Sequence, residues 1–492
     1  MSKNEQAQVE IRQADIVIVG CGAGGMAAAI EAKDNGAERI IVLEKLHAPG
    51  GNCIFPPLPL ANEDGVLKMA CMDDNTLLDD DLRLNPDITV RTDANFKSAM
   101  EWNHWRGDAR LIRTLINKFE GVSDWLKSNM EPADFLPDPE VNRGKLAKLL
   151  IRFCKARGIE VLCDTPVKNL LKDKNGRVNG VLAETKDGNK IQVNAKSVII
   201  STGGFIGSKE LMAKYFHSYT ESVFDDLCIM GLRHTGDGIK MALDAGAASD
   251  GTVAFEWELN RVPWLNNPVS PLTNLLNNDI HPDLIWVNKN GERFADESKL
   301  NATNSWYRLP HKTCYILLDE AMKNRIIKNG PVKMPDFMIG LDLFAGLDDE
   351  LKDQEAKGRV KISDSWDELA EFIGADPEVL KATVDEYNSF CDKKHDDMFV
   401  KNPEYLTPLR TGPFYVAKST LAMLVTRGPL KVNTKMELLD TNDDPIPGLY
   451  AAGVDIGGTD SDTYASGVAC HSIGWSLSSG RIAGENAAKA AK

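Results

Sequence analysis

The chain has 492 residues, of which 43% are hydrophobic and 26% charged, and its formal net charge is −15. This composition predicts a soluble globular protein of two or three domains, because a single core rarely grows beyond about 300 residues. The negative charge argues against general attraction to nucleic acid phosphates.

The lack of long apolar runs, the polar start of the chain and the spacing of the cysteines limit where the protein is expected to be found and which cofactors it is expected to bind. No apolar run approaches the roughly 20 residues that cross a bilayer, and the polar start of the chain lacks the apolar stretch of a signal peptide. A cytoplasmic protein without membrane insertion is therefore predicted, with a flexible tail over residues 1–14. Nine cysteines occur without a CxxC pair, which argues against a disulfide framework, a zinc or iron–sulfur site and attached haem. No metal site is predicted, and electrons must enter from another molecule.

Residues 15–44 form a strand, a glycine turn, an alanine-rich helix and a second strand that ends on an acid. Gly20 permits the tight turn, Gly22 lets backbone approach a pyrophosphate, and Gly25 allows close packing of helix on strand. The helix N-terminus offers N–H groups to the anion, and Glu44 is placed to accept a hydrogen bond from a ribose hydroxyl. This order of elements predicts a dinucleotide site; a Gly-rich turn in an ordinary α/β protein is the alternative.

The middle of the chain changes from helix to strand. Residues 65–150 are predicted to be mostly helical, and short strands follow at 159–164, 177–184 and 189–202.

Two later segments repeat the pattern of an apolar strand that stops at glycines. They are 198–205 (VIISTGGF) and 448–458 (GLYAAGVDIGG), and a helix closes the chain. Strand-then-glycine segments so far apart imply a discontinuous cofactor domain. We expect that domain over 15–259 and 426–492, with an inserted domain over 260–425 that closes over the cofactor.

Jointly, the motifs resemble the flavoprotein superfamily of fumarate reductase and succinate dehydrogenase, which includes 3-ketosteroid dehydrogenases and related C=C reductases. The resemblance implies an α/β fold: a discontinuous Rossmann-like FAD-binding domain of the GR2 type with an inserted α+β capping domain. Non-covalent FAD is expected, because His47 lies closer to the following Gly pair than the family's linking histidine. The matching segments are GxGxxG with Glu44, LEKLHAPGGN, STGGF, HTGDGIKMALDAGA, WVNKNGERFADE, VNTKMELLD, GLYAAG and GRIAG.

The resemblance also implies the cofactor contacts. The segment 50–52 is expected beside the flavin, 202–204 near the adenosine, and Asp455 near the ribityl chain or ring, although Val454 stands where the family often has a glutamate. The predicted FAD-binding residues are Gly20, Gly22, Ala23, Gly24, Gly25, Glu44, Lys45, Gly50, Gly51, Asn52, Val167, Thr202, Gly203, Gly204, Asp237, Gly453 and Asp455.

Departures from the family pattern argue against fumarate as substrate. Fumarate reductases hold a dicarboxylate with two histidines and two arginines, one of which donates the proton. Here Leu259 or Asn260 stands at the first histidine, Asn301 at the proton-donating arginine and Val425 at the second histidine. Asparagine and valine supply neither a proton nor fixed charge, and two carboxylates in a water-poor pocket need charged partners.

The segment 461–475 resembles instead the 3-ketosteroid dehydrogenase segment in which a tyrosine and a glycine N–H polarise a substrate carbonyl. Tyr464 and Gly467 are the candidates, because a phenol and a backbone N–H both donate to a developing enolate. Packing of Tyr464 in a Gly-rich turn is the alternative. The family's other tyrosine is replaced by Asn301, so the likeness to the steroid enzymes is partial.

Several further residues each have two interpretations. Arg427 reaches a carboxylate or the flavin N1/O2 region, or forms a salt bridge. Asp462 accepts a proton or holds Tyr464, or caps local backbone. An ordinary solvated carboxylate is favoured for Glu258, and a structural role for His281 and His471. Core packing is favoured for the tryptophans Trp257, Trp264, Trp286 and Trp306, and a packed thiol for Cys53.

The predicted function is transfer of hydride between flavin N5 and a C=C or CH–CH bond conjugated to a carbonyl, with enoate or enone reduction preferred. Tyr464 or Asp462, acting through water, is the expected proton donor; Gly467, Arg427 and Asn301 complete the candidate catalytic set. A 3-ketosteroid dehydrogenase-type desaturase and a non-catalytic flavin electron-transfer subunit are the alternatives. The expected partners are a small unsaturated carbonyl compound and an unidentified electron donor or acceptor.

Overall fold

The structure is a computed structural model that describes most of the chain. The described residues are 9–54, 60–61, 67–68, 88–131, 145–216, 228–229, 233–251, 254–261, 270–277, 280–299, 302, 305–306, 308–333, 342–461 and 471–492.

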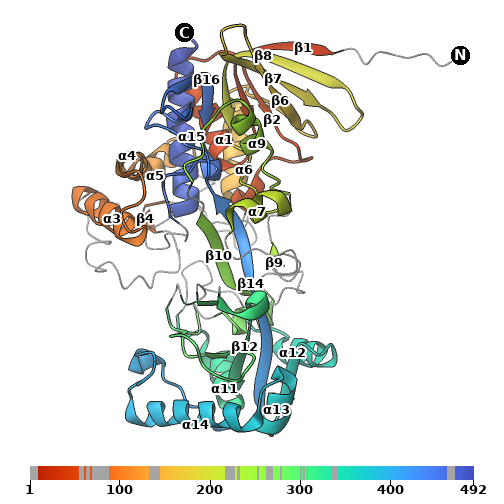
Figure 1. Cartoon of the computed structure of the whole chain (residues 1–492), viewed down its shortest axis with the longest axis vertical. Helices are drawn as coiled ribbons and strands as arrows, with labels where there is room; N and C mark the ends of the chain where they lie inside the picture. Colours follow the sequence, from red (N-terminus) through yellow and green to blue (C-terminus); the bar gives the residue numbers. More distant parts are fainter. Residues whose placement is uncertain are drawn as a thin grey trace, which may run out of the picture.

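A mixed α/β unit is built on an eight-stranded sheet, shown in the upper part of Figure 1. Five strands run parallel in the order β16-β8-β1-β2-β5, and β15 joins the β16 edge in antiparallel pairing. The apolar residues of β2 and the last four residues of β1, β8 and β16 are buried throughout, which is typical of strands covered on both faces. The bounds are β1 (Glu10–Val19), β2 (Ile40–Leu43), β5 (Glu160–Leu162), β6 (Val167–Lys172), β7 (Val178–Glu184), β8 (Lys190–Ile200), β15 (Glu437–Leu439) and β16 (Pro445–Ala451). The last two strands of the eight, β6 and β7, form an antiparallel extension from β8.

The predicted flexible tail over residues 1–14 is wrong for its last residues. The strand β1 begins at Glu10, and its first part pairs with β8 from Ile191 to Ala195. The segment EIRQA (residues 10–14) shows no apolar run, because this part of β1 is largely exposed and only Ala14 is buried. A hydrophobic pattern does not report strands whose side chains face solvent.

Helices pack on this sheet and against each other. In the described part of the chain, α1 contacts both α15 and α6. A Cβ built on Gly480 of α15 would lie 2.2 Å from the Gly24 carbonyl oxygen of α1, so glycine allows the close approach of these helices. The helices of this unit are α1 (Ala23–Asp34), α3 (Ile88–Trp102), α4 (Ala109–Glu120), α5 (Val122–Lys127), α6 (Lys145–Ala156), α7 (Lys209–Tyr215), α9 (Asp237–Asp244) and α15 (His471–Ala490).

A second unit is built on a six-stranded sheet with the order β10-β14-β12-β11. The strands β13 and β9 also pair with β14, along its first and second halves. The bounds are β9 (Cys228–Ile229), β10 (Ala254–Arg261), β11 (Ile285–Val287), β12 (Thr313–Asp319), β13 (Val360–Ser363) and β14 (Phe414–Arg427), with helices α10 (Pro271–Leu275), α11 (Glu320–Asn329), α12 (Leu347–Ala356), α13 (Trp366–Ile373) and α14 (Pro377–Lys393).

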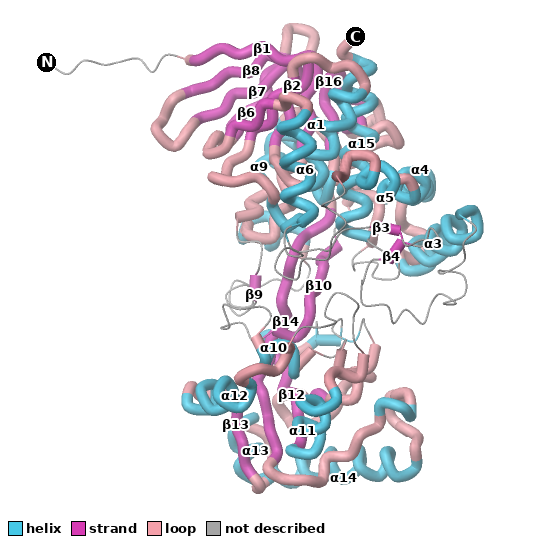
Figure 2. The backbone as a smooth tube through the Cα atoms, turned by 180° about the vertical axis from the view of Figure 1, so that it is seen from behind, coloured by secondary structure: helices cyan, strands magenta, loops and turns pink. Residues whose placement is uncertain are grey.

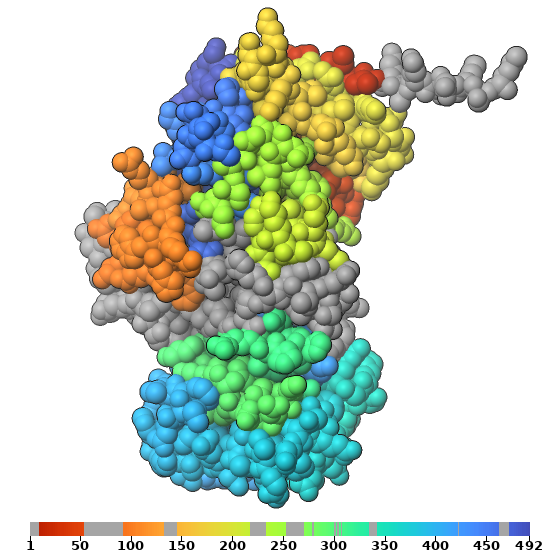
Figure 3. Space-filling model, in the orientation of Figure 1, coloured from red at the N-terminus to blue at the C-terminus, as the bar shows by residue number. Residues whose placement is uncertain are grey.

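The long strand β14 joins the two units. Figures 1 and 2 show β14 and β10 side by side, running from the second sheet towards the first. Figure 3 shows the result as a surface, with the green and cyan residues of the second unit below the red, yellow and dark blue residues of the first. The sequence placed the start of the inserted domain at residue 260, but two strands of the second sheet, β9 and β10, begin before that residue. The domain boundaries themselves stay a prediction.

The short elements in the described part of the chain are the strands β3 (Leu60–Ala61) and β4 (Leu67–Lys68) and the 3₁₀ turns η1 (Gly51–Ile54), η4 (Pro310–Lys312), η6 (Pro403–Tyr405) and η7 (Gly453–Asp455). Among the described helices, none combines the length and the apolar character needed to span a membrane.

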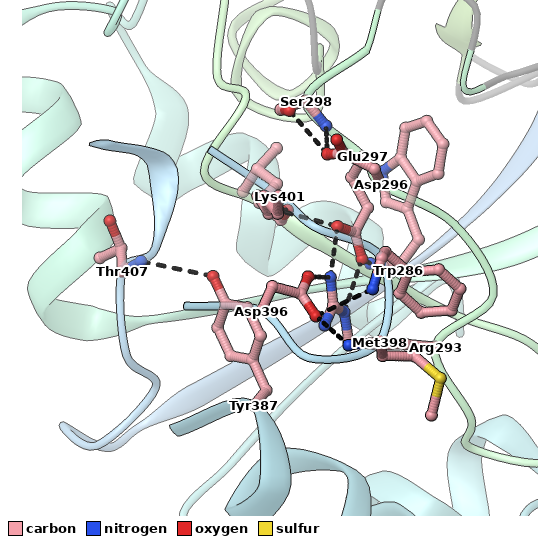
Figure 4. Close-up of polar contacts among 12 residues, drawn as sticks. Trp286, Arg293, Asp296, Glu297, Ser298, Tyr387, Asp396, Met398, Lys401 and Thr407 are labelled. Carbon is pink, nitrogen blue, oxygen red and sulfur yellow. Dashed lines mark hydrogen bonds and ion pairs between the residues drawn. The ribbon is translucent and has the colours of Figure 1, made fainter. Parts of the chain in front are cut away.

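A buried charge cluster lies within the second unit (Figure 4). It consists of Arg293, Glu297, Asp396 and Lys401, whose side chains are at most 6% exposed. The Arg293 guanidinium donates to both Glu297 oxygens and to Asp396 at 3.0 Å, and the Lys401 ammonium lies 3.2 Å from Glu297. Burial opposes ionisation of Glu297, but Lys401 and Arg293 outweigh it and lower the pKa of this carboxyl.

Candidate functional site

The first glycine turn has the geometry that a pyrophosphate needs. Gly20 has φ +103°, and a Cβ there would lie 2.1 Å from the Ser201 carbonyl oxygen. Gly22 precedes α1 without any side-chain hydrogen bond to the helix N-terminus, and a Cβ on it would meet no atom within 4 Å. Gly25 is packed so closely that a Cβ would lie 2.1 Å from the Gly20 carbonyl oxygen. The N-terminal end of α1 therefore has free space beside Gly22, whereas Gly20 and Gly25 are packed against backbone. Such space fits an anion held by backbone N–H groups.

The segment after β2 lies against this turn. The Gly50 N–H donates to the Cys21 carbonyl at 2.9 Å, and a Cβ on Gly51 would lie 3.6 Å from the Gly22 Cα. The Asn52 amide reaches towards the Leu424 carbonyl of β14 at 3.5 Å. Three of the residues predicted to line the flavin side, Gly50, Gly51 and Asn52, thus meet the first turn and the end of β14.

Cys53 behaves as a packed thiol, in line with the structural interpretation of the sequence. Its Sγ donates to the Gly50 carbonyl at 2.8 Å, and burial raises its pKa to about 12. The thiol is thus held in its neutral, unreactive form.

The second and third glycine turns are tied together by Asp455. Its carboxylate is fully buried and accepts hydrogen bonds from the Thr202 N–H, the Thr202 hydroxyl at 2.9 Å and the Gly204 N–H at 2.7 Å. Burial raises the pKa of Asp455, although these donors oppose the rise. Gly453 lies beside the first turn, with its nitrogen 3.2 Å from a Cβ built on Gly24. Residues of all three strand-then-glycine segments therefore meet at one place.

Glu44 and Lys45 mark the predicted adenosine end. The Glu44 carboxylate accepts from the Cys21 N–H at 2.8 Å and the Leu46 N–H at 2.9 Å, and its own backbone carbonyl accepts from the Thr165 N–H, two residues before Val167. The Lys45 ammonium lies 2.8 Å from Asp237 at the start of α9.

Thr235 also belongs to this end of the site, although it was not among the residues predicted from the sequence. It accepts from Lys45 at 2.9 Å and donates to Asp237 at 2.9 Å. Its place between His234 and Asp237 in the HTGDG motif was the signal that could have identified it.

The end of β14 is bonded to the glycine turns. The Thr426 hydroxyl accepts from the Phe205 N–H at 2.9 Å, the Gly428 N–H donates to the Val454 carbonyl at 2.9 Å, and the Leu430 N–H donates to the Asp455 carbonyl at 3.0 Å. The second sheet is thus connected to the turns that are expected to hold the cofactor.

Arg427 forms a buried salt bridge. Its Nε donates to Asp460 at 2.8 Å, its Nη2 donates to the Thr459 hydroxyl at 3.2 Å, and its Cζ lies 5.0 Å from the centre of the Trp475 ring. Only 4% of Arg427 is exposed. Nothing in the sequence pointed to Asp460 as the partner, because 33 residues separate the two.

Other predicted residues have different outcomes. Trp286 and Trp306 pack edge to face with ring centres 5.1 Å apart, both fully buried, and His281 is fully buried as well. Asn301, Asp462, Tyr464 and Gly467 lie outside the described residues, as do Trp264 and the side chains of Trp257, Glu258 and His471.

Comparison with known proteins agrees with this geometry. The family model described as an FAD binding domain matches residues 15–56 and 118–467. A vinyl phenol reductase of Lactiplantibacillus plantarum is 28% identical over 96% of both chains. An NADH:fumarate oxidoreductase of Klebsiella pneumoniae is 30% identical over 97% of this chain but only 48% of its own length, so this chain spans about half of that relative.

Among solved structures, a 3-ketosteroid Δ1-dehydrogenase of Sterolibacterium denitrificans superposes with a TM-score of 0.71 at 17% identity, over 97% of this chain and all of the other, which shows a shared fold. The family match covers well over half of the chain and includes the first glycine turn, η1, the STGGF turn and the end of β14. The chain therefore belongs to the FAD binding domain family, and its predicted membership of the fumarate reductase and succinate dehydrogenase flavoprotein superfamily, with FAD as cofactor, is confirmed.

Proposed function

We propose that this protein is an FAD-dependent oxidoreductase that reduces a C=C bond conjugated to a carbonyl group. The observation that carries the proposal is the convergence of three glycine turns at the end of β14, where the second unit meets the predicted cofactor site. The relatives support the type of reaction, since those that align with nearly all of this chain are named as reductases of vinyl phenol, fumarate and urocanate.

The same proposal gives the two units their roles. The first sheet unit is the Rossmann-like FAD-binding domain of the GR2 type, and the second is the capping domain that supplies the other wall of the substrate site. Support comes from the parallel order of β16, β8, β1, β2 and β5 and from the insertion of the second sheet between β8 and β16 in the sequence.

A dicarboxylate is not the preferred substrate. Val425, at the position of the family's second histidine, is an apolar side chain only 4% exposed. Arg427, two residues further, already faces Asp460 at 2.8 Å. A second carboxylate entering this region would lose its hydration without gaining a dedicated cation from Val425 or Arg427, which disfavours its binding.

Each of the predicted site residues has a proposed role in FAD binding or in catalysis. Backbone N–H groups at Gly22 and the start of α1 hold the pyrophosphate, Glu44 holds the ribose, and Gly50, Gly51 and Asn52 lie beside the flavin. When bound, FAD supplies a hydride from its N5 atom. Tyr464 and the Gly467 N–H polarise the substrate carbonyl, Tyr464 or Asp462 delivers the proton to the α-carbon through water, and the Arg427–Asp460 salt bridge fixes the chain just before these residues.

Anaerobic reoxidation of the reduced enzyme tests this function. The flavin is reduced with light, and an enone, an enoate, a vinyl phenol and fumarate are added separately. We expect rapid return of the oxidised flavin spectrum with the enone or the enoate and slower return with fumarate and with the vinyl phenol, which has no carbonyl group to polarise. Fastest reoxidation by fumarate would contradict the substrate class, and reoxidation by none would favour an electron-transfer subunit.

The desaturase alternative is tested in the opposite direction. Oxidised enzyme is mixed with a saturated 3-ketosteroid, and bleaching of the flavin would favour a 3-ketosteroid dehydrogenase-type reaction. In either direction Tyr464→Phe should slow the half-reaction strongly while leaving the spectrum of bound FAD unchanged, because the phenol acts on the substrate.

A further inference from the structure

Asp455 lies on the buried side of the second glycine turn, the STGGF turn. The residue has no accessible surface, whereas Thr202 and Gly203 in the middle of the turn are partly exposed. The carboxylate is therefore covered by protein, and the surface that the turn offers to a cofactor belongs to Thr202 and Gly203.

The hydrogen bonds of this carboxylate come from the turn itself. One oxygen accepts from the N–H of Thr202 and, at 2.9 Å, from its hydroxyl, and the other oxygen accepts from the Gly204 N–H at 2.7 Å. Neighbouring backbone N–H groups in such a turn form a concave site for an anion. Asp455 fills this site with a carboxylate of the protein, so these N–H groups are already bound.

The shape of the turn depends on these bonds. Gly203 and Gly204 have φ +91° and +84°, and glycine loses more conformational freedom in a fixed backbone than any other residue. Two consecutive glycines leave the turn many conformations unless another group fixes it. The carboxylate does so, because it binds the N–H groups on either side of Gly203.

Asp455 is itself held by elements outside the turn. It ends η7, whose first residue, Gly453, donates its N–H to the Ser479 hydroxyl of α15 at 2.9 Å. The Asp455 carbonyl accepts from the N–H of Leu430, three residues after the end of β14, at 3.0 Å. The carboxylate thus sets the position of the STGGF turn relative to α15 and β14.

We infer that Asp455 is a positioning residue for FAD, which holds Thr202 and Gly203 at the cofactor site from their buried side without contacting the cofactor. A turn that is already fixed pays less conformational entropy when FAD binds. The inference rests on FAD as the cofactor, and it is independent of which C=C compound is reduced.

FAD binding to the apoprotein tests the inference without measuring turnover. The dissociation constant is measured by quenching of flavin fluorescence, and the melting temperature shows whether each variant is folded. Asp455→Asn keeps the size of the side chain but only one acceptor oxygen, and it should weaken FAD binding by about tenfold. Thr202→Val, which removes the hydroxyl that donates to Asp455, should weaken binding by about threefold.

The double variant shows whether Asp455 acts through the turn. Both substitutions disrupt the same contact, so Asp455→Asn combined with Thr202→Val should weaken FAD binding by less than the product of the two separate factors. A loss equal to that product would overturn the inference, because it would mean that Asp455 acts on FAD independently of the turn. Unchanged affinity in folded Asp455→Asn would overturn it as well. If Asp455→Asn does not fold, unchanged affinity in Thr202→Val overturns it.

Asp319 in the second unit is the matched control. Its carboxylate is only 1% exposed and accepts from the N–H groups of Met322, Arg410 and Thr411 at 2.8, 2.8 and 2.9 Å. Asp319→Asn should lower the melting temperature, as Asp455→Asn does, but leave the FAD dissociation constant unchanged. Equal loss of FAD affinity in the two variants would overturn the inference, because general destabilisation would then explain both.

Discussion

At the scale of single residues, glycines that are alike in the sequence differ in what a side chain would meet. A Cβ on Gly22 meets no atom within 4 Å, whereas one on Gly25 meets the Gly20 carbonyl oxygen at 2.1 Å. Gly22→Ala should therefore leave the apoprotein's stability within about 0.5 kcal/mol of wild type yet weaken FAD binding by at least about tenfold, because the methyl group enters the space expected for the pyrophosphate. Urea unfolding and FAD titration check both parts.

Gly25→Ala is the matched variant for that experiment. Its methyl group would collide with backbone, so the apoprotein itself should lose about 1–3 kcal/mol of stability. Equal FAD affinity in Gly22→Ala and wild type would show that the pyrophosphate does not approach Gly22.

A second residue-scale prediction concerns pH. Burial lowers the pKa of His281 to about 3, from 6.5 in an exposed histidine, and Arg325 adds to the effect. Below pH 6.5 the unfolded chain takes up a proton that the folded chain refuses, so the free energy of unfolding falls by about 1.4 kcal/mol per pH unit and the loss is absent above that pH. His281→Gln should remove this part of the acid sensitivity, measured by urea unfolding at several pH values between neutrality and pH 5.

The exposed His395 is the control, and His395→Gln should keep the wild-type pH dependence. An unchanged slope in His281→Gln would mean that the folded protein protonates His281 as readily as the unfolded chain does.

The sequence predicted local backbone better than long-range pairing. The turns at Gly20 and Gly203 could be predicted because a positive φ or a close backbone approach leaves glycine as the suitable residue. The partners of charged residues could not, because a charge specifies no distance along the chain. Lys45 and Asp237 are 192 residues apart, and both were predicted from motifs without any indication that they form an ion pair.

At the scale of elements, the contact between α1 and α15 depends on glycine in a helix. Alanine is favoured over glycine inside a helix by about 1 kcal/mol, but a Cβ on Gly480 would meet the Gly24 carbonyl oxygen at 2.2 Å. The collision should outweigh propensity, so Gly480→Ala is expected to destabilise the protein by about 1–3 kcal/mol. It should also weaken FAD binding, because Gly24 is in the first turn of α1.

Gly121→Ala provides the comparison, since its nearest neighbour would be a carbonyl oxygen at 3.8 Å and its φ is −84°. It should change the free energy of unfolding by less than about 0.5 kcal/mol. A Gly480→Ala protein as stable as Gly121→Ala would mean that the helices separate without cost.

The buried charge cluster links the segment that follows β11 to the segment that follows α14 in the second unit. Lys401 is 1% exposed and donates to the Leu284 carbonyl at 2.8 Å and to Glu297 at 3.2 Å. Lys401→Met removes one cation from a buried group of two cations and two anions, and we expect a loss of about 3–5 kcal/mol in urea unfolding. Adding Glu297→Gln should recover part of this loss, because the excess negative charge is then removed.

An exposed lysine is the control for this variant. Lys393 pairs with Asp397 at 2.7 Å with both side chains 52% exposed, so Lys393→Met should cost less than about 1 kcal/mol. Equal losses for the two lysines would contradict the assignment of Lys401 to a cluster in which burial makes the ion pairs matter.

At the scale of the whole molecule, the two units are linked by hydrogen bonds at the end of β14. The sequence predicted an inserted domain, but it did not predict that one strand of 14 residues would pair with four others and then bond to the glycine turns. That arrangement depends on pairing between segments far apart in the sequence. The hydrophobic periodicity within one segment carries no information about such pairing. FAD bound at the turns should therefore stabilise the second sheet as well as the first.

Thr426→Val tests this coupling. The Thr426 hydroxyl is fully buried and accepts from the Phe205 N–H, which the valine would leave without an acceptor at a cost of about 1–3 kcal/mol. In hydrogen exchange, FAD should protect both β1 and β12 of the wild type. In Thr426→Val, protection should persist in β1 and decrease in β12, because the link between them is weakened.

Thr420→Val is the matched control in the same strand, since the Thr420 hydroxyl has no hydrogen-bond partner among the described residues, and this variant should behave as wild type. Undiminished protection of β12 in Thr426→Val would show that the units are coupled elsewhere.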